Sequence, residues 1–370
     1  MKLIHMADCH LDAEFGALFR GEEAVARRRE LLMTFLSAVD YAAENGFAGI
    51  LISGDLFDGK LVSETTGNTV LRAMKEHPGI RFFYLKGNHD EGTARGNRGK
   101  RFPEEFEEVP ENLTVFGETE TVEFDCATVT GIDIASAGPH VYENLDLPAE
   151  KTNIVLLHGQ IRDAFGENDR ENIPLRSLRE KNIDYLALGH LHTYRSGELD
   201  ARGIYAYSGC LEGRGFDECG EKGFVELDIS EETGRVSAVF KAFSKRKLML
   251  LNYDISNDES TGEVLSGVTE RMRETGVSGD YGVKLVLSGT FNPENEWNPG
   301  VVEARFRENF RLFRLKDETK PRVNFADYAG EVSLKGEFVR LLENAPGLTE
   351  EEKAEIIRVG LSALRGEEPV

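Results

Sequence analysis

Side chains of the metal-ligand type stand at five places in the first part of this sequence, each at the end of an apolar run. The runs end in D-C-H, G-D-L-F-D, G-N-H-D, H-G and G-H-L-H, and they contain five of the chain's eight histidines. Carboxylate, amide and imidazole groups without a thiolate suit borderline-to-hard divalent ions such as Mn²⁺, Fe²⁺ or Zn²⁺. We therefore predict a metal site built from Asp8, His10, Asp55, Asn88, His158, His190 and His192.

Two ions explain this set better than one. Seven or eight ligands exceed what a single octahedral ion accepts, whereas a carboxylate that bridges two ions about 3.5 to 4 Å apart divides them naturally. Each motif alone is weak, because D-x-H and H-x-H pairs occur often by chance and a buried histidine usually does no more than make a hydrogen bond. The prediction depends on the five motifs together, in order, each at the end of a run.

The apolar runs are typical of strands that are buried on both faces of a sheet. They cover residues 2–8, 48–55, 80–87, 152–159 and 183–190. In open α/β sheets the carboxyl ends of the strands meet at one edge, so we expect the five motifs to converge there. A glycine precedes Asp55, Asn88 and His190. We expect these glycines to let the backbone turn sharply as each strand ends.

The segments between the motifs predict the fold class. A helix is expected over 22–45, where Asn45-Gly46 forms a C-cap. Alternating β patterns follow at 113–134 and again at 203–243. Helices and strands in this order predict an α/β protein, a layered sandwich with mixed sheets.

A smaller second unit is predicted after the basic run SKRK near residue 245. Its expected elements are a strand over 248–256, a helix over 263–276, a strand over 281–289 and an amphipathic helix over 301–315. Two short helices follow, and the second opens with a capping box of Thr349 and Glu352. We therefore divide the chain into a main domain, 1–244, a small α/β domain, 245–330, and a helical tail, 331–370.

Composition sets the class of protein. With 370 residues, 40% of them hydrophobic, the chain can form more than one core. No run approaches the roughly 18 apolar residues of a membrane span, so we expect a cytoplasmic protein with no membrane association. The four cysteines form no C-x-x-C pair, which favours a reducing compartment and no chemical role. The net charge of −22, taken alone, counts against nucleic acid as a partner.

The five motifs, in this order, resemble the calcineurin-like metallophosphoesterase superfamily over about residues 1 to 230. Within it, the segments HMADCHLDAEF, GDLFDG and YSGCLEGRGFDECGEKGFVELDI are similar to the SbcD-type nuclease subunits of DNA double-strand-break repair. The resemblance implies a four-layer α/β/β/α sandwich, in which the small α/β domain caps the active site. It also implies a DNA exonuclease or endonuclease that works with an SbcC-type coiled-coil ATPase.

The resemblance further implies roles for the motif residues. One metal would be held by Asp8, His10, Asp55 and His192, and the other by Asp55, Asn88, His158 and His190. Mn²⁺ is the expected ion, with Fe²⁺, Zn²⁺ or Mg²⁺ as alternatives. His89 would serve the leaving oxygen as proton donor or charge stabiliser. Asp58 and Asp90 are expected to orient ligands or to cap the following helix.

Two basic clusters are candidates for binding phosphates. The first follows G-N-H-D directly and contains Arg95, Arg98, Lys100 and Arg101. The second is one face of the helix expected over 301–315, with Arg307, Arg311 and Arg314, although a solvated helix face explains it equally well. In the tail, Ala354, Ile357, Leu361 and Leu364 form a stripe that suits either docking onto the ATPase or packing onto the chain's own small domain.

Three questions stay open at this level. A small-molecule phosphodiesterase or phosphatase on the same fold is the main alternative, and the charge of −22 favours it. A non-catalytic scaffold is a weaker one, because a scaffold has no reason to keep a complete ligand set and His89. Whether the chain forms a homodimer is not given by its sequence.

Overall fold

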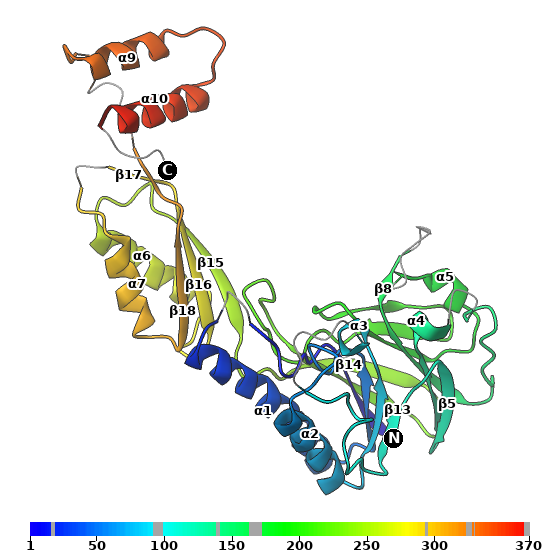
Figure 1. Cartoon of the computed structure of the whole chain (residues 1–370). Coiled ribbons are helices and arrows are strands. Elements are labelled where there is room, and N and C mark those ends of the chain that lie inside the picture. Colours follow the sequence, from blue (N-terminus) through cyan, green and yellow to red (C-terminus); the bar gives the residue numbers. More distant parts are fainter. Residues whose placement is uncertain are drawn as a thin grey trace. The chain divides into compact units, whose positions relative to one another are not determined.

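The computed structural model divides into two compact units, Met1–Leu248 and Met249–Val370. It describes residues 1–15, 19–91, 99–137, 141–162, 172–292, 295–322, 328 and 330–365. The division falls four residues after the predicted boundary at 244, and the further separation of a tail at 330 stays a prediction. Figure 1 shows the elements of each unit.

The first unit contains two mixed six-stranded sheets, as predicted. The first sheet has the order β14-β13-β1-β2-β3-β4, and its strands are β14 (Val236–Ala242), β13 (Gly223–Ile229), β1 (Lys2–Met6), β2 (Gly49–Ser53), β3 (Arg81–Leu85) and β4 (Leu113–Val115). The second has the order β11-β12-β10-β7-β6-β5, and its strands are β11 (Arg195–Glu198), β12 (Ile204–Tyr207), β10 (Tyr185–Gly189), β7 (Thr152–His158), β6 (Ala127–Ile132) and β5 (Thr119–Phe124). The strands that precede the motifs run parallel within each sheet: β1, β2 and β3 in one, β7 and β10 in the other.

The two sheets pack face to face over one apolar core. Leu3, Leu51 and Phe83 of the first sheet meet Leu156 and Tyr185 of the second in this cluster, and all five side chains are buried. Each β-strand of the first sheet that bears a motif is continuously apolar because its other face is covered as well.

Helices cover the outer faces unequally. On the first sheet, α1 (Glu22–Glu44) packs on β2 and on α2 (Glu64–Glu76) (Figure 1). The predicted end of α1 is confirmed, since Asn45 is its C-cap and Gly46 has a φ of 69°. On the second sheet the outer layer consists of loop residues such as Tyr142 and Leu147 with the one-turn helices α4 (Ile134–Ala137) and α5 (Leu175–Leu178). The α/β/β/α sandwich is therefore confirmed, with a thin fourth layer.

The second unit has a three-stranded sheet, β15-β16-β18, covered on one face by α6 and α7. The elements are β15 (Leu248–Asp254), β16 (Gly282–Ser288), β18 (Leu312–Asp317), α6 (Thr261–Glu274) and α7 (Pro299–Arg307). The helix expected over 301–315 is wrong in its second half, because α7 ends at Arg307 and the chain then enters β18. Phe313 and Leu315 lie beside Val283 and Leu285 of β16, so sheet pairing outweighs the helical periodicity of this segment. Arg314 therefore does not share a helix face with Arg307.

The last described helices, α9 (Leu334–Glu343) and α10 (Glu350–Arg365), pack on each other. The predicted capping box is confirmed: Thr349 N–H donates to Glu352 at 2.8 Å, and Glu352 N–H donates to the Thr349 hydroxyl at 3.2 Å. Of the predicted stripe, Ile357 and Leu361 are buried against Val339 of α9, whereas Leu364 is exposed. Among the described residues, no helix combines the length and apolar character that crossing a membrane requires.

Candidate active site

The motif residues come together where the carboxyl ends of both sheets meet. The hydrogen bonds that join the strand ends are Asp8 N–H to Gly54 C=O (3.1 Å) and His158 Nδ1–H to Ser53 C=O (2.9 Å). The backbone N–H of His190 donates to both oxygens of the Asp8 carboxylate, at 3.0 Å each. The predicted convergence on one edge is therefore found, but two sheets contribute to that edge.

Four of the predicted residues have a backbone conformation that L-residues rarely adopt. The φ angles are 51° at Asp8, 43° at His10, 50° at Asp55 and 100° at His190. Each such residue costs on the order of 1–3 kcal/mol and persists only where its surroundings fix it. Here hydrogen bonds between the motif segments fix it, including His10 N–H to Asp55 C=O at 3.0 Å. The strain supports a functional site at this edge.

Two clusters of ligand atoms share this edge. In the first, the Asp8, His10 and His192 ligand atoms lie within 4.8 Å of one another, and in the second those of Asp8, Asp55 and His158 do. His158 Nε2 lies 3.3 Å from Asp55 Oδ2 and 2.9 Å from the Asn88 amide oxygen. The His190 ring lies beside the His158 ring, with 5.6 Å between centroids. The two clusters have Asp8 in common, while Asp55 Oδ2 also lies 3.8 Å from His10 Nε2.

The donor set fits metal ions. Nε2 of His10 and Nε2 of His192 are only 3.2 Å apart, while Nδ1 of each ring faces a carboxylate, Asp58 at 3.1 Å and Glu218 at 2.6 Å. A carboxylate accepts hydrogen bonds, so the proton on each ring belongs on Nδ1, which leaves two Nε2 lone pairs that would face and repel each other. A cation between them removes that repulsion. The carboxylates of Asp8 and Asp55 are buried as well, and a buried negative charge is unfavourable unless a cation lies beside it.

The pKa shifts of Asp55 and His158 in the second cluster also indicate that positive charge is favoured there. Burial alone would raise the pKa of Asp55, but the His158 ring beside it outweighs burial and lowers that pKa. Burial likewise would lower the pKa of His158, yet Asp55 raises it to about 10. The carboxylates of this cluster therefore favour positive charge beside them.

His89 has a different environment from its neighbour Asn88. Its Nδ1 lies 3.2 Å from Asp58 Oδ1, its backbone N–H donates to Asp55 at 2.9 Å, and its side chain is 36% exposed. The hydrogen bond to Asp58 raises the pKa of His89 more than burial lowers it. His10, Asp58 and His89 also form a third group of ligand size. However, the nitrogen of each ring that faces Asp58 is Nδ1, which is what an orienting carboxylate produces.

The general family model for calcineurin-like phosphoesterases matches residues 1–194, more than half of the chain. The chain belongs to the calcineurin-like phosphoesterase family. It is accordingly a metal-dependent phosphoesterase, a hydrolase of phosphoester bonds, in agreement with the sequence prediction.

Two curated relatives carry the name DNA double-strand break repair protein Mre11. The one from Sulfurisphaera tokodaii is 24% identical over 276 residues, which cover 70% of this chain and 67% of the relative. The one from Saccharolobus solfataricus is also 24% identical over 276 residues, covering 68% and 66%. The chain thus spans about two thirds of the length of these relatives. A solved dimetal phosphatase from Danio rerio matches 65% of this chain and 98% of its own, at 11% identity and a TM-score of 0.38.

Two residues of the phosphoesterase site were not predicted from the sequence, Arg214 and Glu218. Glu218 Oε1 accepts from His192 Nδ1 at 2.6 Å and from Arg214 Nη2 at 2.9 Å, and Arg214 Nη1 donates to Asp58 at 3.1 Å. Burial would raise the pKa of Glu218, but His192 and Arg214 lower it. Both residues lie in the segment YSGCLEGRGFDECGEKGFVELDI, which resembles SbcD-type subunits, but the resemblance gave neither residue a role, and an arginine four residues before an acid is too common a spacing to identify a site.

Asp90, the acid of the G-N-H-D motif, joins two motif segments. Its carboxylate accepts the backbone N–H groups of Leu56 at 3.3 Å, Phe57 at 2.9 Å and Gly87 at 2.9 Å. Burial raises the pKa of Asp90, and the charge of Asp55 raises it further. Asp90 therefore ties the segment after β2 to the segment after β3 and contacts no predicted ligand side chain in these bonds.

The glycines before the motifs have two different reasons to be glycine. Gly54 has a φ of 91° and serves the turn, as predicted, and a Cβ there would also overlap the His158 ring. Gly87 and Gly189 serve as space instead: a Cβ on Gly87 would overlap Asp55 Oδ1, and one on Gly189 would overlap the Ser53 carbonyl. Gly87 therefore lets the segment after β3 approach Asp55, and Gly189 lets the end of β10 approach Ser53 at the end of β2.

The predicted phosphate-binding loop is described only in part. Arg95 and Arg98 lie outside the described residues. Of the other two, Lys100 pairs with Glu64, and Arg101 Nε donates to Glu105 at 2.8 Å. Their positive charges are thus balanced by neighbouring acids, and a contact with phosphate stays a prediction.

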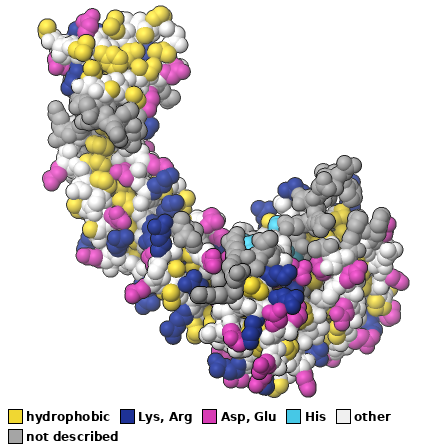
Figure 2. All heavy atoms as spheres, in the orientation of Figure 1, with side chains coloured by type: hydrophobic (Ala, Val, Ile, Leu, Met, Phe, Trp, Pro, Cys, Tyr) yellow, Lys and Arg dark blue, Asp and Glu magenta, His cyan; other side chains and the backbone are white. Residues whose placement is uncertain are grey.

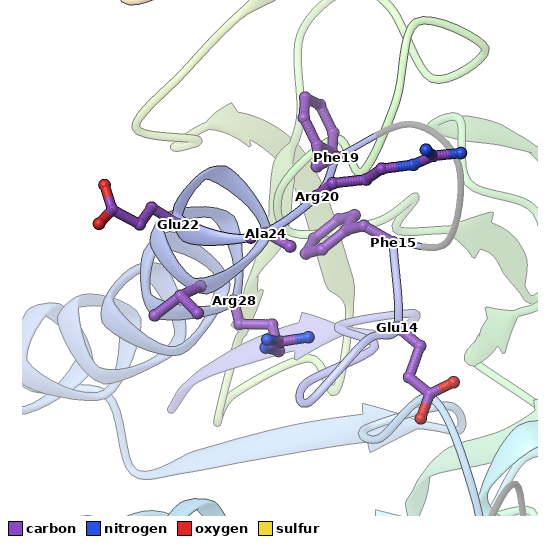
Figure 3. Close-up of a pocket in the computed structure, with 9 residues that line it drawn as sticks. Glu14, Phe15, Phe19, Arg20, Glu22, Ala24 and Arg28 are labelled. Atoms are coloured by element: carbon purple, nitrogen blue, oxygen red, sulfur yellow. The ribbon is translucent and has the colours of Figure 1, made fainter.

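A hollow of about 780 Å³ lies beside the start of α1 and contains none of the predicted ligands. Phe15, Phe19 and Ala24 line it, with Arg28 and Glu14 among its polar side chains, as Figure 3 shows. Histidine side chains instead reach the surface of the first unit elsewhere, as Figure 2 shows. We assign the active site from the ligand clusters, because the chemistry requires those groups and this hollow has none of them.

Proposed function

We propose that this phosphoesterase is a DNA nuclease of the SbcD and Mre11 type, which cleaves phosphodiester bonds in double-strand-break repair. The observation that carries the proposal is the extent of the similarity to the relatives named Mre11. It covers 276 residues, whereas the general phosphoesterase model matches only residues 1–194. The similarity to the relatives named Mre11 therefore includes sequence beyond residues 1–194.

In this proposal Asp8, His10, Asp55 and His192 hold one ion and Asp55, Asn88, His158 and His190 hold the other. Mn²⁺ is the ion that we assign. When bound, two divalent ions at these residues would supply Lewis-acid chemistry: a lower pKa for water and compensation of the charge on phosphate oxygens. Asp55 lies beside both His10 Nε2 and His158 Nε2, at 3.8 and 3.3 Å, which suits a carboxylate shared by the two ions, while Asp8 belongs to both ligand clusters.

His89 supplies the proton to the leaving oxygen. With Nδ1–H donated to Asp58, its Nε2 is the atom that remains to serve the substrate. The Asp58 hydrogen bond raises the pKa of His89, so the ring holds its proton at a higher pH than a free histidine does. A 3′ or 5′ oxygen of deoxyribose is a poor leaving group, which makes this proton transfer necessary for cleavage of DNA.

Contact with DNA is proposed at the open face of the second unit's sheet. Lys284 and Arg314 are register partners on β16 and β18, and Lys316 follows Arg314 by two positions, so all three side chains lie on the same face. The opposite face, with Val283, Leu285 and Phe313, packs under α6 and α7. Given the net charge of −22, we expect weak and salt-sensitive affinity for DNA.

The proposed partner is an SbcC-type coiled-coil ATPase, docked on the α9–α10 pair. Several apolar side chains of this pair are exposed although Ile357 and Leu361 are buried: Leu334, Leu341, Ile356, Val359 and Leu364. Exposed apolar side chains gathered on two packed helices are typical of a surface that another protein covers. Such a partner would supply the grip on DNA that this acidic chain lacks.

A small-molecule phosphodiesterase or phosphatase is the second candidate. The charge of −22 favours it, because an acidic surface repels a polyanion. The second unit and the exposed apolar side chains of α9 and α10 count against it, since a small substrate needs neither.

A panel of substrates distinguishes the two candidates. Purified protein is given linear duplex DNA, single-stranded DNA and bis-p-nitrophenyl phosphate, with Mn²⁺ or with a chelator, and with or without the ATPase. We expect Mn²⁺-dependent release of nucleotides from DNA. Turnover of the small ester alone, even with the ATPase present, would overturn the nuclease proposal and favour the second candidate.

A further inference from the structure

A single carboxylate oxygen, Asp58 Oδ1, joins three functional groups. It lies 3.1 Å from His10 Nδ1, 3.2 Å from His89 Nδ1 and 3.1 Å from Arg214 Nη1. The Asp58 side chain is only 9% exposed, so water competes little for these bonds. The position of this oxygen therefore sets the orientation of the His89 ring.

Arg214 and Glu218 hold Asp58 from the other side. Glu218 Oε1 accepts from Arg214 Nη2 at 2.9 Å and from Nε at 3.1 Å, and its Oε2 accepts the Arg214 backbone N–H at 2.7 Å. Two bonds from one guanidinium to a carboxylate fix direction as well as distance. The same Glu218 Oε1 accepts from His192 at 2.6 Å, so this pair connects His192 to Asp58.

The segment that carries Arg214 is itself anchored. The guanidinium of Arg27 donates to the Gly213 carbonyl, and the buried Glu212 carboxylate accepts the backbone N–H groups of Lys245 at 2.8 Å and Arg246 at 3.1 Å. Gly213 is thus fixed to α1, and Glu212 is fixed to residues 245–246. Arg214 starts from a rigid backbone, as a positioning residue must.

The orientation of the His89 ring, by contrast, depends on a side chain outside its own helix. It lies on α3 (Asn88–Glu91), a single turn directly after β3, and its ring is more exposed than the rings of His10 and His192. A ring on one turn of helix can rotate about its χ angles unless a partner fixes it. Asp58 is that partner, and Arg214 holds Asp58.

We propose that Arg214 is a positioning residue that, paired with Glu218, holds Asp58 and through it turns His89 Nε2 toward the leaving oxygen. This role rests on the proposed phosphodiesterase function. It differs from support of the metal ligands alone, which would affect every substrate equally. A positioning role for the proton donor matters most where the leaving oxygen is basic and needs the proton.

The test compares leaving groups. Wild type and Arg214→Gln are assayed with Mn²⁺ on bis-p-nitrophenyl phosphate, whose leaving group departs without a proton, on diphenyl phosphate and on DNA, and the Mn²⁺ content of each protein is measured. We expect Arg214→Gln to lose about tenfold or more in kcat on diphenyl phosphate and DNA, with little change on the nitrophenyl ester and with wild-type Mn²⁺ content. His89→Gln should show the same pattern with a larger loss.

Arg202→Gln is the matched control, because Arg202 makes a comparable pair with Asp184 at 2.9 Å away from the site. It should leave all three rates near wild type. Equal losses of Arg214→Gln on all esters together with loss of Mn²⁺, or no loss on any ester, would overturn the positioning role. If wild type cleaves both small esters but not DNA, the nuclease proposal fails, and the comparison of the two small esters still decides the role of Arg214.

Discussion

Asn88 and His89 are adjacent in the chain but face different partners. The Asn88 amide oxygen lies 2.9 Å from His158 Nε2, inside the second ligand cluster, whereas His89 Nδ1 lies 3.2 Å from Asp58. A one-turn helix produces this divergence, because successive residues on a helix point about 100° apart. The sequence predicted different jobs for the two residues, and their surroundings differ accordingly.

The first prediction concerns His89. His89→Gln should lower kcat on DNA by about 10²- to 10⁴-fold, because the proton donor is removed. The Mn²⁺ content should stay at the wild-type level in elemental analysis. If the variant loses its metal as well, His89 is a ligand and not the proton donor.

The second prediction concerns Gly87. Gly87→Ala places a methyl group against Asp55 Oδ1 and the Asp55 backbone nitrogen, so Asp55, a proposed metal ligand, must shift from its present position. We expect weaker Mn²⁺ binding, measured by calorimetry, and a loss of activity. Gly79→Ala is the control, since a Cβ there meets no atom within 4 Å, and it should bind Mn²⁺ as wild type does. Equal affinity in both variants would show that Asp55 does not need its present position.

At this scale the sequence predicts residues that belong to ordered motifs and misses those that do not. Asp8, Asp55 and His158 follow buried strands, so the sheet brings them together. Arg214 and Glu218 belong to a loop whose contacts with Asp58 and His192 depend on how the whole first unit folds. No local periodicity encodes such contacts, and only the structure identifies them.

At the scale of elements, buried strands and helix ends were predictable, and one helix was not. The strands before the motifs and the end of α1 agree with their patterns. The segment 308–315 has apolar residues at helical spacing, but its residues 312–315 pair with β16 as a strand. A short apolar run does not distinguish helix from strand by itself, and here a partner strand decided the outcome.

The third prediction tests the α9–α10 pair through two neighbouring residues. Ile357 is fully buried and Ile356 is 40% exposed. Ile357→Asp buries a charge and should unfold the pair, measured as faster hydrogen exchange in 334–365, while hydrolysis of bis-p-nitrophenyl phosphate stays near wild type. Ile356→Asp should keep the pair folded but weaken binding of the ATPase. Normal ATPase binding by Ile356→Asp would contradict docking on this surface.

For the whole molecule, the negative net charge of the chain opposes the binding of a polyanionic substrate such as DNA. The net charge is −22, and residues 1–244 carry most of it. The metal ions offset part of that charge at the site, and the cationic sheet face of the second unit offers a described surface for phosphates. Affinity for DNA should therefore depend strongly on salt.

The fourth prediction measures that dependence. Changing Lys284, Arg314 and Lys316 together to Gln should lower the slope of log Kobs against log salt by about 0.9 for each phosphate that the variant no longer neutralises. Lys316 pairs with Glu318 at 2.5 Å, and Arg271 and Arg273 on the exposed side of α6 pair with acids as well, so the comparison isolates the sheet face. Changing Arg271 and Arg273 should leave the slope unchanged, because they lie outside that face. An unchanged slope in the triple variant would place the DNA contact elsewhere.

The most direct test of the two-metal site is the number of metal ions that the chain binds. Metal-free protein is loaded with Mn²⁺, and the ions per chain are counted by elemental analysis in wild type, His89→Gln and Asp55→Asn. We expect two ions in wild type and in His89→Gln, and loss of both in Asp55→Asn, because Asp55 is, in our proposal, the ligand that the two ions would share. A single ion in wild type, or two ions retained without the Asp55 carboxylate, would contradict a site in which Asp55 joins two ions.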